Sequence, residues 1–211
     1  MEILQYVVGP MLNLCYALID EETKSAIVVD PAFGSAVVLD DLRSRGLRVA
    51  GVVNTHAHLD HVAENARFLA ETGAPLIAHE DERSNYASLD AQAAWFGVPP
   101  PEPAEPCVWL RDGERVSVGS DELTALHTPG HSPGGLSLLG DGFALVGDVL
   151  FAGSIGRADL PGGDQELLIS TIRTKLLCLP DETIVYPGHG DPATNTHRTT
   201  IGHERRTNPF L

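Results

Sequence analysis

The segment Thr55-His56-Ala57-His58-Leu59-Asp60-His61 contains four potential metal ligands within six residues. It follows the apolar run Val49–Val53, which is typical of a buried strand, and it leads into a helical pattern. Side chains alternate along an extended backbone, so we expect His56 and His58 to point the same way. Asp60 and His61 then turn with the chain and can serve a second, adjacent position. Imidazole is a common ligand of zinc and iron, and carboxylates suit harder ions, so the segment predicts a metal site.

Three turns elsewhere in the chain each supply one further potential ligand directly after an expected strand. They are Gly130-His131, Gly147-Asp148 and Gly188-His189-Gly190. The glycines beside each ligand let the backbone approach a crowded centre. A lone histidine after a strand is usually a solvated or hydrogen-bonded loop residue, so none of these turns predicts a ligand by itself. Joined to the first segment, they bring the total to five histidines and two aspartates, which are enough for two ions.

The rest of the chain alternates between runs typical of strands and runs typical of helices. Strands are expected at residues 3–8, 13–19, 25–30, 49–54, 75–79, 107–110, 115–118, 122–127, 136–139, 143–147 and 183–186. Helices are expected at residues 35–45, 61–72, 80–96 and 165–179. The proline-rich stretch 98–106 is expected to be an extended surface connector, because proline has no N–H and a fixed φ. This order predicts an α/β fold in which two mixed sheets pack together with helices outside.

Length and composition indicate an ordinary globular protein. The chain has 211 residues, of which 43% are hydrophobic and 20% charged, and we expect one domain over residues 1–211. No apolar run approaches the roughly 20 residues that cross a bilayer, and the N-terminus has no basic region or cleavage site typical of a signal peptide. These features predict a cytoplasmic protein without a membrane partner. With 14 basic and 29 acidic residues, the net charge of −15 also disfavours binding to nucleic acid.

The three cysteines are Cys15, Cys107 and Cys178. Their odd number and wide spacing do not fit a disulfide framework or a thiolate zinc site. We expect all three to be small buried hydrophobic residues in a reducing compartment.

The motifs quoted above carry a family resemblance. His56-x-His58-x-Asp60-His61, followed by the three glycine-flanked ligands, resembles the ligand pattern of the metallo-β-lactamase superfamily. His58 stands where the flavo-diiron branch of that superfamily has Glu. The segments Gly147–Phe151, Gly156–Leu160 and Glu204–Leu211 resemble those of short, bacterial-type glyoxalase II-like enzymes, the hydroxyacylglutathione hydrolases.

The resemblance implies a four-layer αβ/βα sandwich with the metals at one edge. Carried over position by position, it implies a first ion on His56, His58 and His131. It implies a second ion on Asp60, His61 and His189, with Asp148 bridging the two. Two divalent ions are therefore expected as cofactors, zinc first, with iron or manganese as alternatives.

For function, the resemblance implies hydrolysis of a thioester, with S-lactoylglutathione cleaved to lactate and glutathione. The two ions would lower the pKa of a bridging water, and the resulting hydroxide would attack the carbonyl carbon. Asp60 would help to orient that hydroxide. Thiolate is a good leaving group, so no strong general acid is required. The expected partner is a small-molecule thioester, and the sequence leaves a homo-oligomer open.

Two further residues are candidates for supporting roles. Asp30, in Val29-Asp30-Pro31, either orients a ligating histidine or only forms a turn before proline. Arg157 either fixes the loop after Asp148 by pairing with Asp159 or contacts the substrate, and the pairing is favoured.

The main alternative is a persulfide dioxygenase of the same superfamily, with one Fe(II) on His56, His131 and Asp148. That family resembles Gly-Cys-Gly-Arg-Thr-Asp in a segment where this chain has Ser154-Ile155-Gly156-Arg157-Ala158-Asp159, which argues against it. A hydrolase of another small ester or lactone, a β-lactamase and a nuclease are weaker alternatives. A non-catalytic binding module would be expected to lack some of the seven ligands, and this chain has all of them.

Overall fold

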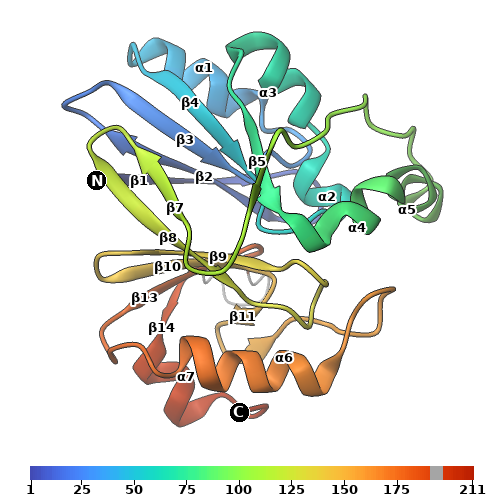
Figure 1. Cartoon of the computed structure of the whole chain (residues 1–211), viewed down its shortest axis with the longest axis vertical. Coiled ribbons are helices and arrows are strands. Elements are labelled where there is room, and N and C mark those ends of the chain that lie inside the picture. Colours follow the sequence, from blue (N-terminus) through green and yellow to red (C-terminus); the bar gives the residue numbers. More distant parts are fainter. Residues whose placement is uncertain (191–196) are drawn as a thin grey trace.

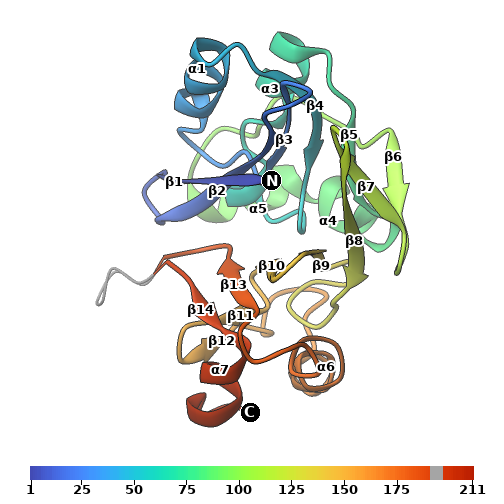
Figure 2. The same ribbon diagram turned by 90° about the vertical axis from the view of Figure 1, so that its left-hand side faces the viewer.

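Two six-stranded sheets lie face to face in the computed structural model, which describes residues 1–190 and 197–211 (Figure 1). Helices cover the outer face of each sheet, and the view in Figure 2 shows α6 end-on against the second sheet. Three buried apolar clusters follow this layering, one between the sheets and one beneath the helices on either side. The predicted four-layer α/β sandwich is therefore confirmed.

The first sheet contains the N-terminal strands in chain order. They are β1 (Glu2–Val8), β2 (Asn13–Asp20), β3 (Ser25–Val29), β4 (Arg48–Val53), β5 (Leu76–His79) and β6 (Val108–Leu110). Strands β1 to β3 pair antiparallel, whereas β3 to β6 are parallel, so these later strands end at the same edge. Helices α1 (Ala36–Ser44) and α3 (Asn65–Thr72) cover its outer face (Figure 1).

The second sheet has the order β14-β13-β10-β9-β8-β7. Its strands are β7 (Arg115–Val118), β8 (Asp121–His127), β9 (Leu136–Gly140), β10 (Phe143–Gly147), β13 (Ile184–Pro187) and β14 (Thr199–Thr200). Strands β10 and β13 are parallel, so the turns that follow them lie at one edge. A short hairpin of β11 (Leu150–Phe151) and β12 (Ser154–Ile155) follows β10. Helices α6 (Gln165–Thr171) and α7 (Ile201–Thr207) cover the outer face.

The apolar core between the sheets explains why they stack. Leu18 and Ile27 from the first sheet lie in one cluster with Leu123, Leu138 and Leu145 from the second, all essentially inaccessible to solvent. Burial of each such side chain stabilises the fold by about 1.5–3 kcal/mol. Inward residues of both sheets pack in this shared core, while the alternating outward residues face away from it. This packing keeps the ends of the strands in the two sheets, and the turns that follow them, close together.

Two predicted helices are broken, and each break lies next to the histidine segment. The helix expected at 61–72 is divided into α2 (Leu59–Val62) and α3, because the Glu64 N–H donates to the Pro31 carbonyl, 2.9 Å away. The helix expected at 80–96 is divided into a 3₁₀ turn (Glu80–Glu82), α4 (Arg83–Ala87) and α5 (Leu89–Phe96). The expected extended connector at 98–106 contains no helix or strand, in agreement with its prolines.

Other differences are smaller. The helix expected at 165–179 is α-helical to Thr171 and continues as a π-helical stretch, Ile172–Leu176. Strands β11, β12 and β14 and helix α7 were not predicted. The three strands have two residues each, too few for an alternating pattern to be visible.

The exposure of the three cysteines differs from the prediction. Cys15 is buried, but Cys107 and Cys178 are exposed, so the prediction of three buried cysteines is wrong for two of them. Cys107 lies at the end of the proline-rich connector and Cys178 lies beyond the π-helical stretch, both at the surface.

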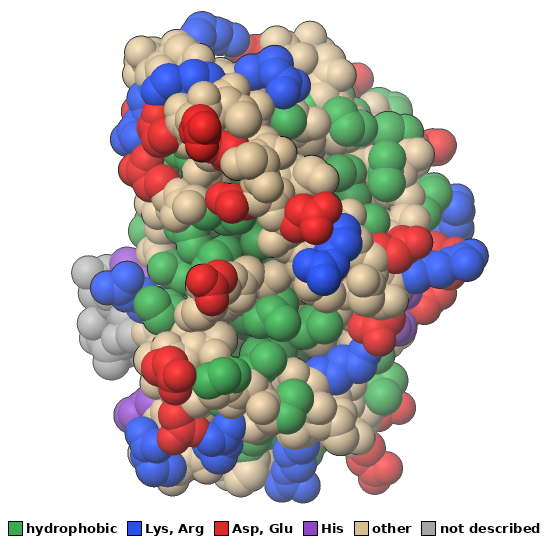
Figure 3. Space-filling view, turned by 60° about the vertical axis from the view of Figure 1, so that its left-hand side comes forward, with side chains coloured by type: hydrophobic (Ala, Val, Ile, Leu, Met, Phe, Trp, Pro, Cys, Tyr) green, Lys and Arg blue, Asp and Glu red, His purple; other side chains and the backbone are tan. Residues whose placement is uncertain are grey.

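No helix among residues 1–190 and 197–211 is long and apolar enough to cross a membrane. On the face shown in Figure 3, acidic and basic side chains are interspersed.

Candidate metal centre

The predicted ligands meet at the edge where strands of both sheets end. His56 follows β4, Asp148 follows β10 and His189 follows β13. His131 lies in the turn between β8 and β9, and the turn containing Thr55 bonds to β9 through the Leu136 N–H. The topology thus brings together side chains that are far apart in the sequence.

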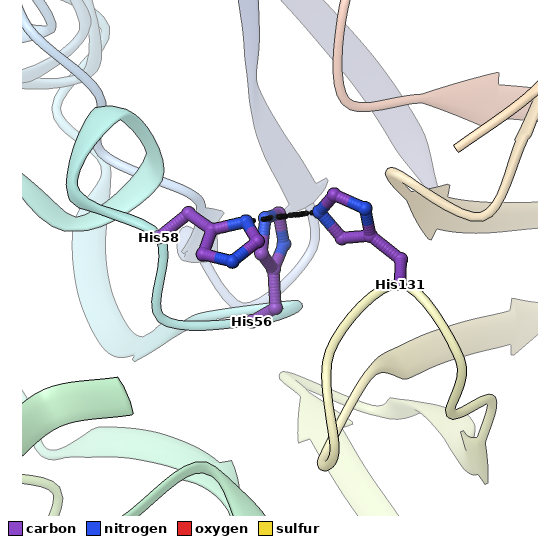
Figure 4. A group of neighbouring side chains, drawn as sticks. All are labelled: His56, His58 and His131. Carbon is purple, nitrogen blue, oxygen red and sulfur yellow. Dashed lines mark hydrogen bonds between the residues drawn. The ribbon is translucent and has the colours of Figure 1, made fainter. Parts of the chain in front are cut away.

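His56, His58 and His131 form the first group (Figure 4). The His131 Nε2 atom lies 2.9 Å from His58 Nδ1 and 3.3 Å from His56 Nε2. The His131 Nδ1 atom lies 2.7 Å from the Arg157 carbonyl, which can only accept, so Nδ1 carries the proton and Nε2 presents a lone pair. As the alternation of side chains predicts, His56 and His58 point into the same site.

Asp60, His61 and His189 form the second group. The His61 Nε2 atom lies 3.1 Å from His189 Nε2, and the Asp60 Oδ2 atom lies 3.4 and 3.3 Å from these two nitrogens. The outer Nδ1 atom of His189 donates to the Met11 carbonyl at 2.9 Å. The Nε2 atom of His189 is therefore the one turned towards the carboxylates.

Asp148 lies between the two groups. Its Oδ2 atom is 3.7 Å from His131 Nε2 in the first group and 3.4 Å from His189 Nε2 in the second. Its Oδ1 atom is buried and has no hydrogen-bond partner among the described residues. This is the position that a carboxylate shared by two cations would take.

Burial and neighbouring charges separate the protonation states of the two groups. Burial lowers the pKa of His58 to about 4, and His131 acts in the same direction. Burial also holds the pKa of His56 well below its usual value, with His61 and His58 contributing. Both imidazoles are therefore neutral near pH 7, the form in which histidine binds a metal.

In the second group, the nearby carboxylates shift the pKa of His189 more strongly than burial does. Burial opposes a charge on His189, but Asp148 and Asp60 raise its pKa to about 10. Burial likewise opposes a charge on Asp148, but His61 and His189 hold the pKa of this carboxyl well below its usual range. The second group therefore pairs carboxylates with positive charge, a role that a bound cation can also fill.

The spacing of the donor atoms fits metal ions. Ligand atoms about 2.0–2.1 Å from a tetrahedral ion lie about 3.3 Å from one another. Five pairs of nitrogen and oxygen atoms within the two groups are separated by 2.9–3.4 Å. In the metal-free form an imidazole N–H can bridge such a pair, as between His58 Nδ1 and His131 Nε2, and a bound cation would take the place of these protons. A side chain at Gly188 would fill part of this space, because a Cβ there would come within 2.1 Å of Asp148 Oδ1.

The two residues predicted to have supporting roles both lie beside the groups. The Asp30 Oδ2 atom is 3.1 Å from His61 Nδ1, and Asp30 also accepts from the Thr55 N–H and hydroxyl. Asp30 thus holds the His61 ring with Nε2 turned inward. The Arg157 side chain pairs with Asp159 at 2.7 and 2.8 Å, as favoured from the sequence.

Three residues in contact with the ligand turns were not predicted. Asn13 donates to Asp60 Oδ2 at 2.9 Å. The Gln92 amide accepts from the Leu59 N–H and donates to the Ala57 carbonyl, on either side of His58. Glu82, which is fully buried, is the third. Glu82, Asn85 and Gln92 lie in three different helical pieces, but they are spaced as on one face of the helix expected over 80–96, and this polar stripe is the signal that could have indicated Glu82 and Gln92.

Glu82 joins the two loops of the first group. Its Oε2 atom accepts from the Ala57 N–H at 2.8 Å, between His56 and His58. Its Oε1 atom accepts from the Gly134 N–H at 2.7 Å, in the turn that carries His131. Asn85 donates a third hydrogen bond, at 2.8 Å. A carboxylate that accepts all three can position both loops without touching a ligand atom.

We predict that Glu82→Gln weakens metal binding in a folded protein. The new NH₂ group would face an N–H donor, so at least one loop loses its anchor. Loss of a group that orients metal ligands typically costs 10–100-fold in affinity, and we expect about that loss in competition with a chromophoric chelator. Glu80→Gln is the matched control, because Glu80 pairs with Arg111 at the exposed surface. Equal affinity in the Glu82 variant and wild type would limit Glu82 to a general structural role.

An open cavity of about 490 Å³ lies over the two groups. His58, Asp60, His131, Asp148 and His189 line its floor. Its size is within the range of sites that hold small molecules. The clustered side chains can therefore meet a ligand from solvent.

Comparisons with known proteins agree with this geometry. A sequence model described as the metallo-beta-lactamase superfamily matches residues 8–189. A Haemophilus influenzae protein named hydroxyacylglutathione hydrolase GloC is 37% identical over 199 residues, which cover 92% of this chain and 91% of that protein.

Two solved structures also align over nearly the whole chain. BLEG-1 B3 metallo-β-lactamase has a TM-score of 0.90 and 33% identity, covering 100% of this chain and 99% of that one. TTHA1623 in a di-iron-bound form has a TM-score of 0.87 and 35% identity, covering 99% of this chain and 100% of that one. The similarity thus includes every segment that contributes to the two groups.

Proposed function

The chain belongs to the metallo-β-lactamase superfamily and is a metallo-hydrolase, and from this premise we propose that its substrate is a thioester of glutathione. S-lactoylglutathione is the first substrate to test, because the Haemophilus influenzae relative is named a hydroxyacylglutathione hydrolase. Water adds to the thioester carbonyl, a C–O bond forms, and the C–S bond breaks. The products at neutral pH are a carboxylate, a thiol and a proton.

The observation that supports this proposal most directly is the pair of ligand groups with Asp148 between them. We propose that His56, His58 and His131 hold one divalent ion. Asp60, His61 and His189 would hold a second, and Asp148 would contact both. Bound there, two such ions would lower the pKa of a water molecule and polarise the substrate carbonyl. Zinc is the first expectation and iron or manganese the alternative.

Asp60 is the residue to which we assign a direct role in the reaction. Its carboxylate lies on the cavity floor, and Asn13 fixes the position of Oδ2 by donating to it. Asp60 would accept a hydrogen bond from the attacking water and so aim its oxygen at the carbonyl carbon. Since Asn13 is buried, it cannot be replaced by solvent in this contact.

The thiolate leaving group needs little help from a general acid. A thiolate needs little protonation as it departs, because thiols have a pKa near 8.5. The described residues that line the cavity include no lysine, tyrosine or cysteine that would serve as a separate general acid. A thioester fits such a cavity better than an amide, whose nitrogen requires a proton to leave.

The test is release of free thiol from S-lactoylglutathione by the metal-loaded protein. We expect rapid release that is lost in His58→Ala, because His58 lies on the cavity floor within the first group. Lack of release by protein that carries both ions would contradict the thioesterase proposal. Oxygen uptake with glutathione persulfide would then favour the mononuclear Fe(II) alternative on His56, His131 and Asp148.

A further inference from the structure

One wall of the cavity is apolar and is formed by the end of α5. Trp95 and Phe96 are the last two residues of this helix, and they are 66% and 46% exposed. Leu160 and Pro161 line the cavity with them. Hydrophobic residues scattered singly over a surface need no functional explanation. Exposed aromatic side chains beside a cavity do, because a bound ligand can cover them.

This wall offers little to a negatively charged ligand. Among the described residues that line the cavity, Arg157 is the one lysine or arginine, and its guanidinium is engaged by Asp159 through two hydrogen bonds. Transfer of a carboxylate from water onto an apolar surface without a partner is unfavourable. The α5 side is therefore a poor place for the glutathione half of a thioester, which carries two carboxylates.

A second cavity, of about 470 Å³, adjoins the first on the side of His189. It shares Met11 and His189 with the first cavity and also has Arg198 in its wall. Met11, Phe151, Ala152 and Pro187 make much of this second wall apolar, and Arg198 is the cation that it adds. A cation beside His189 suits a carboxylate of the glutathione half, whereas the aromatic rings at the end of α5 offer contacts to an acyl group.

We propose that the acyl half of the substrate lies against Trp95 and Phe96, and that the enzyme prefers thioesters with an extended apolar or aromatic acyl group. The glutathione half then extends towards Arg198. This inference rests on the proposed thioesterase function and adds the class of acyl group. An aromatic acyl group gains offset or edge-to-face contacts with the α5 rings that a methyl group cannot make.

S-mandeloylglutathione and S-lactoylglutathione form a matched pair for the test, because they differ only by phenyl in place of methyl on the same 2-hydroxyacyl group. We expect the wild-type kcat/KM to be about ten-fold higher for the mandeloyl substrate, the effect of one buried aromatic contact. Trp95→Ala and Phe96→Ala should each bring this ratio towards one. Phe210→Ala is the control, because Phe210 is similarly exposed, at 47%, and does not line the cavity.

A binding measurement tests the apolar subsite independently of thioester cleavage. In a Trp109→Phe variant Trp95 is the single tryptophan, so its fluorescence reports directly on the α5 wall. Mandelate should quench it at lower concentration than lactate does. A wild-type preference for lactoyl, or a ratio that neither α5 substitution changes, overturns the inference. If neither thioester is cleaved, the thioesterase proposal fails, and equal quenching by the two acids would then overturn the apolar subsite as well.

Discussion

Replacement of Asp148 by asparagine is expected to reduce the proposed thioester hydrolysis on the order of 10³-fold, because the carboxylate that we propose to be shared by two ions would sustain several kcal/mol of metal-assisted catalysis. The substitution keeps the size of the side chain and removes its charge. Asp148 lies within 3.4–3.7 Å of donor atoms in both groups, so both ion sites are weakened together. The measurements are kcat/KM with S-lactoylglutathione and the number of metal ions per chain.

Asp141→Asn is the matched control for this substitution. Asp141 lies in the exposed turn of the β9–β10 hairpin, where Asn-Gly is as suitable as Asp-Gly. It should retain wild-type activity and metal content. An Asp148→Asn protein with full activity and two ions would show that this carboxylate does not hold them.

Removal of metal is expected to lower thermal stability as well as activity. A ligand present at about 1,000 times its Kd stabilises the native state by about 4 kcal/mol, which for a domain of this size corresponds to about 8–16 °C in Tm. Without a cation the buried Asp148 Oδ1 atom has no hydrogen-bond partner among the described residues, which costs stability. The check is a melting curve before and after dialysis against a chelator.

Restoration of the Tm by added zinc, iron or manganese would show that the effect comes from the site. His203→Gln offers a comparison, since His203 is exposed on α7 and belongs to none of the clusters of potential metal ligands among the described residues. Its Tm should respond to the chelator as the wild type does. An unchanged Tm on complete metal removal would mean that ions contribute nothing to the folded state.

The clustering of the candidate ligands could be predicted in part from the sequence, because the signals of the first segment are local. His56, His58, Asp60 and His61 follow one strand within six residues, and alternation of side chains is enough to place His56 and His58 together. His131, Asp148 and His189 were predicted from glycine turns after strands and from the family resemblance. Their convergence depends on the parallel pairing of β10 and β13 and on the stacking of the sheets, which no local pattern specifies.

The groups that position the ligands could not be predicted in the same way. Glu82 is one of three consecutive acidic residues, Glu80, Asp81 and Glu82, and only the fold turns Glu82 inward while the other two stay at least partly exposed. The single helices expected over 61–72 and 80–96 had to break so that these segments could meet the ligand turns. Local periodicity favours a continuous helix in both places, and the competing contacts, such as that of Glu64 with Pro31, are long-range.

The central claim, that this chain is a two-ion thioesterase, is tested most directly by a metal titration. Metal-free protein is titrated with zinc, and the rate of thiol release from S-lactoylglutathione is recorded at each ratio of ion to chain. The account predicts that the rate rises to a maximum at two bound ions per chain. A rate that reaches its maximum at one bound ion, or that stays at the uncatalysed level with two bound, would contradict it.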